Sequence, residues 1–107
     1  MAPLAPRPSQ ACFMFRCVDG PDAEALRARD LEGHLAHVET HWDQYLIAGP
    51  LRDTASEKLT GSLFLVYANS LDDAWRLMRR DPYFTNGQYQ TIEAQPFLPS
   101  IGLAIGG

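Results

Sequence analysis

The segment HLAHVETHWDQYLIAGP, residues 34–50, joins the end of a helix pattern to the start of a strand pattern and organises the rest of the chain. At about 100° per residue, four apolar side chains of this segment and one from the preceding turn fall on one side of the predicted helix. These are Leu31, Leu35, Val38, Trp42 and Tyr45. The stripe predicts that the helix packs against a core. Residues 45–48 then predict a short strand that ends at Gly49-Pro50.

Upstream of this segment, residues 11–18 (ACFMFRCV) are almost continuously apolar and predict a buried first strand. The sequence DGPD at 19–22 has the composition of a turn and ends it. Asp22 and Asp30 are alternative N-caps for the helix that follows. Gly33 would cost a helix interior about 1 kcal/mol relative to alanine, which favours the later start at Asp30.

Downstream, the chain predicts a strand, a helix and a strand, at residues 61–68, 71–80 and 89–97, after a polar connection at 51–60. Ser70 is suited to cap the helix, because its hydroxyl can accept a backbone N–H of the first turn. Asp81-Pro82 ends the helix, since the residue before a proline is disfavoured in the helical conformation.

The resulting order of strand, helix, strand, strand, helix and strand predicts an α+β fold. It corresponds to a ferredoxin-like split β-α-β unit, with a four-stranded antiparallel sheet and both helices on one face. The open face would carry apolar residues of the first and third strands, so we expect a homodimer packed sheet to sheet. The predicted domain covers residues 11–98, between a flexible N-terminal arm at 1–10 and a tail at 99–107.

Composition excludes several classes of partner. Nine Lys+Arg against thirteen Asp+Glu leave a formal net charge of -4, and Lys58 is the one lysine. Nucleic acid and anionic membranes require a dense cationic surface, so neither is expected as a partner. No apolar run approaches the roughly 20 residues of a membrane span. Cys12 and Cys17 are five apart on a predicted strand and point to opposite faces, which predicts buried free thiols and a cytoplasmic location.

The three histidines of the chain, His34, His37 and His41, are the first candidates for chemistry. Their spacing would allow a shared metal ion, but no HExxH motif accompanies them. The alternatives are solvated histidines, or one histidine that acts as a general acid or base. His34 and His41 lie at the edge of the apolar stripe, and His37 lies further toward solvent. Asp81 either terminates a helix or orients an imidazole.

Several segments, taken in order, resemble the YCII-related (YciI-like) protein family. They are DGPD at 19–22, Leu26-Arg27, His34-Leu35, AGPL at 48–51, Gly61-Ser62, DPY at 81–83 followed by Gly87, and QPF at 95–97. The resemblance implies a dimeric α/β barrel of the ferredoxin-like type, with His34 and Asp81 as the active-site pair. One activity among relatives is dehydrochlorination of a chlorinated hydroxyhydroquinone, and muconolactone isomerases share the architecture.

We therefore expect a small lyase or isomerase that uses no cofactor and no metal and acts on a compact ring or enolisable substrate. His34 would move a proton that Asp81 helps to position, and Arg27 would hold an oxyanion. Gly49, Pro50 and Tyr83 would complete the substrate site. The alternative is a non-catalytic module that binds a small ligand on the same dimeric fold.

Two departures from the family pattern bear on this expectation. Leu31 stands where relatives usually carry an arginine, which weakens the case for an anion site there. The segment from His34 to Gly49 is also about two residues shorter than in typical members, which leaves His37 as an alternative to His34.

Overall fold

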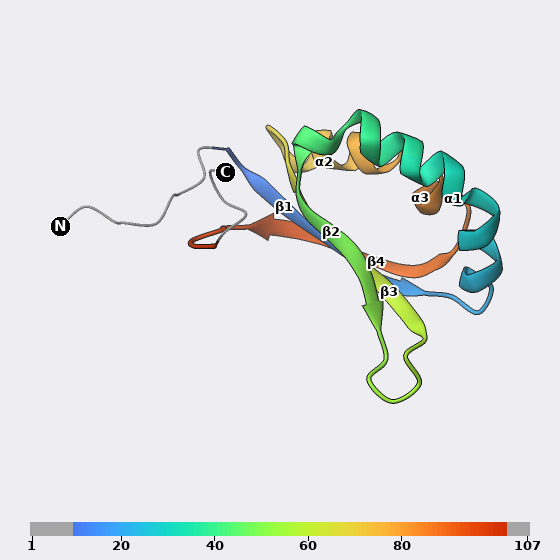
Figure 1. Cartoon of the computed structure of the whole chain (residues 1–107). Coiled ribbons are helices and arrows are strands. Elements are labelled where there is room, and N and C mark those ends of the chain that lie inside the picture. Colours follow the sequence, from blue (N-terminus) through green and yellow to red (C-terminus); the bar gives the residue numbers. More distant parts are fainter. Residues whose placement is uncertain (1–9, 103–107) are drawn as a thin grey trace.

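In the computed structural model, which describes residues 10–102, four strands form one antiparallel sheet with the helices on one face (Figure 1). The elements are β1 (Cys12–Asp19), α1 (Ala23–Thr40), the 3-10 turn η1 (Trp42–Gln44), β2 (Tyr45–Arg52), β3 (Leu59–Tyr67), α2 (Leu71–Met78), α3 (Pro82–Thr85) and β4 (Tyr89–Phe97). The strand order β2-β3-β1-β4 confirms the predicted ferredoxin-like fold. Of the predicted arm and tail, residues 1–9 and 103–107 lie outside the described residues.

The core lies between the sheet and the helices. Alternate residues of the two central strands point toward the helices, and Phe15 of β1 pairs with Phe64 of β3. Phe15, Val66 and Met78 of α2 are completely or almost completely buried. Burying a side chain of this size contributes roughly 1.5–3 kcal/mol, so the aromatic and aliphatic layer under α2 stabilises the fold.

Helix α1 begins at Ala23, so the predicted start near Asp30 is wrong. The reason is the packing of Gly33, which lies in the helix interior against Pro82 of α3. A Cβ at Gly33 would come within 3.2 Å of the Pro82 Cγ. The missing side chain lets α3 approach α1, and this contact outweighs the helix-propensity cost of about 1 kcal/mol.

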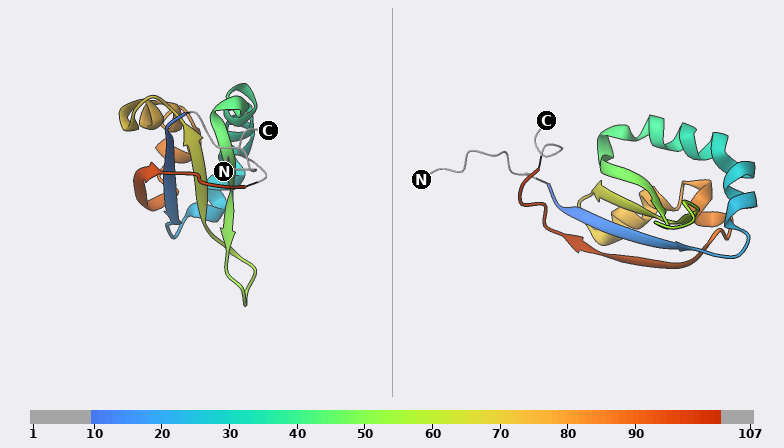
Figure 2. Two further views of the ribbon diagram at one scale, coloured as in Figure 1. Left: turned by 90° about the vertical axis from the view of Figure 1, so that its left-hand side faces the viewer. Right: turned by 60° about the horizontal axis from the view of Figure 1, so that its bottom comes forward.

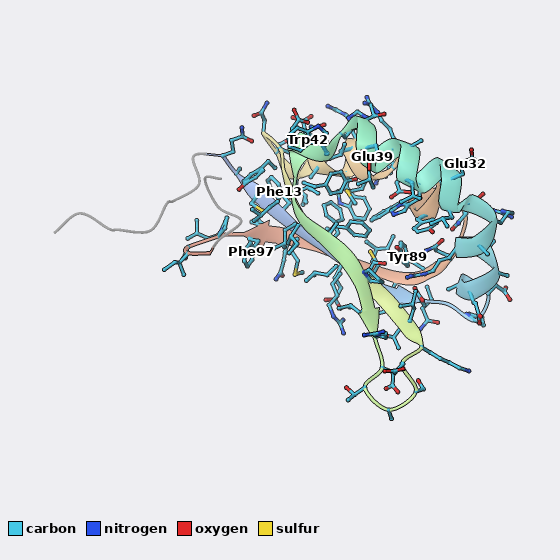
Figure 3. The ribbon with its side chains drawn as sticks, in the orientation of Figure 1. Phe13, Glu32, Glu39, Trp42, Tyr89 and Phe97 are labelled. Carbon is cyan, nitrogen blue, oxygen red and sulfur yellow. The ribbon has the colours of Figure 1, made fainter. Side chains whose placement is uncertain are left out.

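The predicted apolar stripe of α1 is largely exposed. Leu31 and Leu35 are 47% and 51% exposed, and Trp42, which lies in η1 beyond the helix, is 70% exposed. Trp42 lies at the end of α1 in Figure 3, while Phe13 lies in the core. The prediction failed because the leucines line a pocket between α1 and the sheet, so no strand side chains close over them.

Strand β2 continues through Gly49 and Pro50 to Arg52, beyond the predicted end at Ala48. Proline lacks a backbone N–H, and β2 tolerates it because β2 is an edge strand. In the neighbouring strand, a Cβ at Gly61 would collide with the Cys17 carbonyl oxygen. Glycine at this position therefore permits the close pairing of β3 with β1.

The connection from α2 to α3 brings a carboxylate toward α1. Ser70 caps α2 as predicted, with its Oγ accepting from the Asp73 N–H at 3.1 Å. Helix α2 ends at Met78, two residues earlier than predicted. Asp81 then begins the short helix α3 as its N-cap, with Oδ1 accepting from the Tyr83 N–H at 2.9 Å.

The two cysteines are free and buried, as expected. Burial raises the pKa of the Cys17 thiol to about 12, so it stays protonated and unreactive at neutral pH. Separately, no helix within residues 10–102 has the length and apolar character needed to cross a membrane.

The sheet face opposite the helices carries an apolar row. Met14 pairs with Leu65, and Leu65 pairs with Ile47, so the three side chains lie side by side across β1, β3 and β2. Ile47 is 57% exposed. Figure 2 shows that α1 and α2 lie on the same side of the strands, so neither covers this row.

Candidate functional site

A pocket of about 480 Å³ lies between α1 and the β2–β3 half of the sheet. Helix α1 contributes Arg27, Ala28, Leu31, His34, Leu35 and Val38; the strands contribute Ala48, Gly49, Pro50, Leu59, Ser62 and Phe64; and α3 contributes Tyr83. Small residues at several of these positions leave the space open. Mostly apolar walls with a few polar groups are typical of small-ligand sites.

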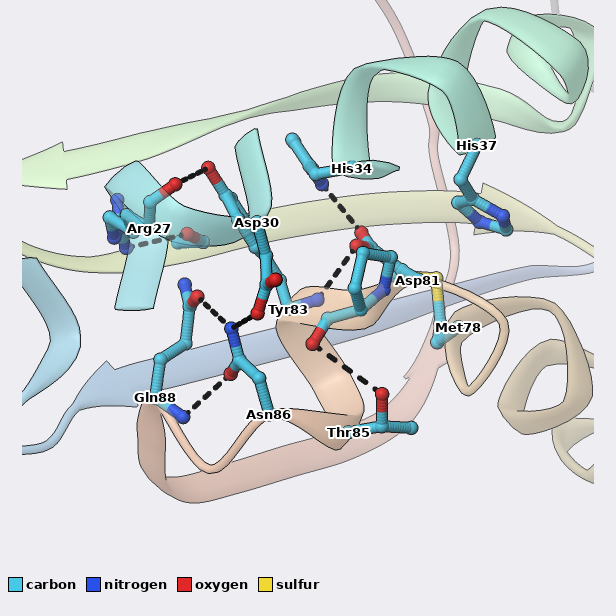
Figure 4. Close-up of polar contacts among 12 residues, drawn as sticks. Arg27, Asp30, His34, His37, Met78, Asp81, Tyr83, Thr85, Asn86 and Gln88 are labelled. Carbon is cyan, nitrogen blue, oxygen red and sulfur yellow. Dashed lines mark hydrogen bonds and ion pairs between the residues drawn. The ribbon is translucent and has the colours of Figure 1, made fainter. Parts of the chain in front are cut away.

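His34 and Asp81 form the central polar contact of this pocket. His34 Nδ1 lies 2.7 Å from Asp81 Oδ2, and the Asp81 side chain is completely buried (Figure 4). Asp81 Oδ1 accepts the N-cap hydrogen bond of α3, so both carboxylate oxygens have partners. A carboxylate only accepts hydrogen bonds, which keeps the proton of a neutral His34 on Nδ1 and leaves a lone pair on Nε2.

Tyr83 fixes the plane of the His34 ring. The two rings stack with centroids 3.9 Å apart and planes 5° apart. The Tyr83 hydroxyl donates to the Arg27 carbonyl oxygen at 3.2 Å, which anchors the far end of the ring to α1. Burial raises the pKa of the Tyr83 hydroxyl, which favours its role as a neutral donor. One face of the imidazole is therefore covered.

Arg27 forms hydrogen bonds to residues on the sheet side of the pocket. Its Nη2 donates to Asp19 Oδ1 at 2.8 Å, to the Gly61 carbonyl oxygen at 3.1 Å and to Ser62 Oγ at 3.1 Å. The side chains of Arg27 and Asp19 are only 12% and 11% exposed. Because Asp19 balances the charge of Arg27, a bound anion would meet a guanidinium that is already paired.

Ser62 is a pocket residue to which sequence reasoning assigned no role. It is 4% exposed, and its Oγ accepts from Arg27 and from the Tyr89 hydroxyl, the latter at 2.8 Å. Burial raises the pKa of Tyr89, so its hydroxyl remains a donor. The available signal was the alternation of β3, which places Ser62 on the same face as Phe64 and Val66.

His37 lies in a different environment, and the prediction that it faces solvent is wrong. It is 8% exposed, and its Nε2 lies 3.0 Å from the Tyr45 hydroxyl oxygen. Burial lowers the pKa of His37. The prediction failed because β2 turns back beneath α1 and brings Tyr45 against this face of the helix.

The three histidines do not converge. The His37 and His41 rings are 4.9 Å apart, whereas His34 is turned toward Asp81. Within residues 10–102, no group of three His, Cys, Asp or Glu side chains is arranged to hold a metal ion.

The structure gathers the predicted site residues in one place. Arg27, His34, Gly49, Pro50 and Tyr83 all line the pocket, and Asp81 lies behind His34. Gly49 pairs with Leu63, whose side chain lies on the open face of the sheet, so Gly49 lines the pocket with its backbone. Proximity supports a common site, while the catalytic and substrate-binding roles stay predictions.

Comparison with known protein families agrees with the architecture. The model of the YCII-related domain matches residues 11–98. A search of curated proteins gave no match.

Solved structures resemble the chain in fold. A 5-chloro-2-hydroxyhydroquinone dehydrochlorinase from Burkholderia phenoliruptrix, in complex with 2,5-dihydroxybenzoquinone, is 21% identical, with a TM-score of 0.73 over 80% of this chain and 92% of that one. A Pseudomonas aeruginosa protein, PA3566, is 17% identical, with a TM-score of 0.50 over 85% and 95% of the two chains. A NIPSNAP family protein from Agrobacterium tumefaciens is 13% identical, with a TM-score of 0.52 over 92% and 96%. These identities show a shared fold alone.

Proposed function

The chain belongs to the YCII-related domain family, and we propose that it is a small enzyme of the lyase or isomerase type that moves a proton with the His34–Asp81 pair. The observation that carries this proposal is the 2.7 Å contact between His34 Nδ1 and a buried carboxylate at the wall of an apolar pocket. An imidazole held in one tautomer beside a cleft is suited to general acid–base catalysis.

The proton would pass through His34 Nε2. A bound ring or enolisable compound would lose a proton to Nε2, and Asp81 would stabilise the imidazolium that forms. The electron pair left on the substrate would form a new double bond. In an elimination the leaving group departs with its bonding electrons, and in an isomerisation the proton returns to another atom. Neither reaction requires an oxidant or a reductant.

The dimensions of the pocket support a compact substrate. A volume of about 480 Å³ with mostly apolar walls suits a single substituted ring. The dehydrochlorinase of similar fold binds 2,5-dihydroxybenzoquinone, a ring of this kind. In the proposed complex, the ring would lie between α1 and β2, with Gly49 and Pro50 at one wall and Arg27 and Tyr83 at the other.

The test compares the wild type with His34→Ala. Two assays cover the proposed reactions: chloride release from 5-chloro-2-hydroxyhydroquinone, and hydrogen–deuterium exchange of small enolisable ketones followed by NMR. We expect His34→Ala to lower an observed rate by about 10²- to 10⁴-fold, the usual contribution of a general base. His41→Ala is the control, because His41 is the C-cap of the same helix and does not line the pocket. Equal rates in the wild type and His34→Ala would contradict the mechanism.

A non-catalytic ligand-binding module is the second candidate. The observation that favours it is the internal pairing of the polar groups around the pocket, such as Arg27 with Asp19. Ring compounds that bind without turnover in both assays would support this candidate.

We further propose a cytoplasmic homodimer. The free, buried thiols support a reducing compartment. The apolar row of Met14, Leu65 and Ile47 supports burial of the open sheet face against a second copy, because such rows seldom stay in contact with water. Leu65→Lys should convert the dimer to a monomer in sedimentation velocity, since it places a charge in this row. Lys58→Glu, in the β2–β3 connection, is the control. A wild type that sediments as a monomer would contradict the proposal.

A further inference from the structure

We propose that the reacting ring or enol carries a short alkyl arm, and that one end of the pocket binds this arm. The end in question, here called the apolar end, consists of Leu35, Val38, Ala48 and Phe64. The inference rests on the proposed function and narrows its substrate class to compact rings or enols with an apolar substituent.

Contacts between α1 and the sheet show how the pocket is oriented. Arg27 of α1 donates to Ser62 of β3, and Ser62 pairs with Pro50 of β2. Two turns or more further along α1, His37 contacts Tyr45 at the start of β2. Strand β2 runs back along α1 (Figure 1), so the pocket has one end near Arg27 and another toward Tyr45.

The apolar end is the one toward Tyr45. Beyond His34, the pocket side chains of α1 are Leu35 and Val38, and the paired residues Ala48 and Phe64 face them from the strands. Among residues 10–102, the side chains that line this end are all apolar. A polar substituent placed here would lose hydrogen bonds to water and regain none from the side chains, whereas an apolar one would gain by leaving water.

The opposite end disfavours an apolar arm. The side chains of Arg27 and Asp19 form an ion pair there and are only 12% and 11% exposed. An apolar group over this pair would remove its remaining water, which costs free energy. A ring with its reacting atom at His34 would therefore direct an apolar arm toward Val38. These two residues are four apart on α1, which is about 6 Å at 1.5 Å per residue and close to the length of a butyl group.

The size of the pocket leaves room for this arm. An apolar cavity of about 150 Å³ accommodates benzene, and the pocket has about 480 Å³. Ala48 provides part of the additional room, because it pairs with the buried Phe64 and carries only a methyl group on the helix-facing side of β2. Leu35 is 51% exposed and would be covered by a bound arm.

The experiment measures the binding of phenol, 4-ethylphenol and 4-butylphenol to the full chain by NMR titration. Complete burial of one methylene group tightens binding about fourfold. Because the pocket wall at Leu35 is half exposed, we expect about two- to threefold for each added carbon. Wild-type protein should therefore bind 4-butylphenol about 15- to 80-fold more tightly than phenol.

Ala48→Leu tests where the alkyl group binds. The larger side chain would occupy the apolar end, so the ratio of the two dissociation constants should fall below about threefold. Ala36→Leu is the matched control, because Ala36 is an exposed residue of α1 that does not line the pocket, and its ratio should equal that of the wild type. Leu35→Asn tests the same end from the helix wall and should also lower the ratio. It changes a half-exposed side chain, so it keeps the test available if Ala48→Leu does not fold.

Three results would overturn the proposal. They are a wild-type ratio below about threefold, as expected if a second copy of the chain fills the apolar end, a ratio that survives in both Ala48→Leu and Leu35→Asn, or an equal loss in Ala36→Leu. All three are measured without turnover. A flat series together with His34-dependent turnover would reject the alkyl arm and leave the mechanism standing, whereas a steep series without turnover would reject the mechanism alone.

Discussion

His34 and His37 lie less than one helical turn apart on α1, yet their imidazoles occupy opposite kinds of environment. The His34 side chain is 16% exposed at a pocket wall and contacts a carboxylate. His37 is 8% exposed and contacts a neutral hydroxyl, that of Tyr45. Spacing along a helix therefore does not decide which histidine is suited to acid–base chemistry. The partner that another element brings to the imidazole decides it.

The two partners come from different distances along the chain. Asp81 is 47 residues from His34 and reaches it because α3 packs on Gly33. Tyr45 is 8 residues from His37 and reaches it through the turn from α1 into β2. The carboxylate of Asp81 thus makes His34 a candidate base, while the hydroxyl of Tyr45 provides a partner for the buried His37.

The largest effect is expected for Asp81→Asn, which removes the carboxylate that contacts His34. Asparagine can still accept the Tyr83 N–H as an N-cap, so α3 should persist. Its amide would donate to Nδ1 and move the His34 proton to Nε2, which removes the base. We expect a fall in kcat of about 10³- to 10⁴-fold, with an unchanged circular dichroism spectrum. Activity near that of the wild type would show that Asp81 only terminates the helix.

An intermediate effect is expected for His37→Ala, which removes the contact between His37 and the Tyr45 hydroxyl. The variant loses a buried ring and leaves the Tyr45 hydroxyl, among residues 10–102, with the Met78 sulfur 3.8 Å away as its remaining partner. We expect a loss of about 2–4 kcal/mol in the free energy of unfolding, measured with urea, and no change in kcat of the folded fraction. His41→Ala should cost less than about 1 kcal/mol. A large fall in kcat for His37→Ala would make His37 the better candidate for catalysis.

The smallest effect is a change in how stability depends on pH. Burial lowers the pKa of His37 in the folded protein, so the unfolded chain binds its proton more readily. Stability from neutral His37 is complete above the unfolded pKa of about 6.5 and is lost as the pH falls toward the lower folded pKa. His37→Gln should therefore show a flatter fall in Tm below that pH than the wild type. If Tm fell equally steeply with pH in the wild type and in His37→Gln, the lowered pKa of His37 would be contradicted.

Much of the fold could be predicted from local patterns. The strand predicted at 89–97 has the bounds of β4, and the Ser70 hydroxyl predicted the start of α2. Both signals depend on residues close in the chain. The start of α1 could not be predicted in this way, because the cost of Gly33 is offset by a contact with Pro82, almost fifty residues away.

For the site, the sequence by itself determined the residue types and the resemblance that joined His34 with Asp81. The tertiary structure alone decided that Trp42 is exposed, that His37 is buried and that Ser62 lies at the pocket between two donors. The physical reason is that burial and hydrogen-bond partners depend on which elements pack together. A helix pattern shows which side chains share a face, but the opposing element determines whether that face meets water, a core or a pocket.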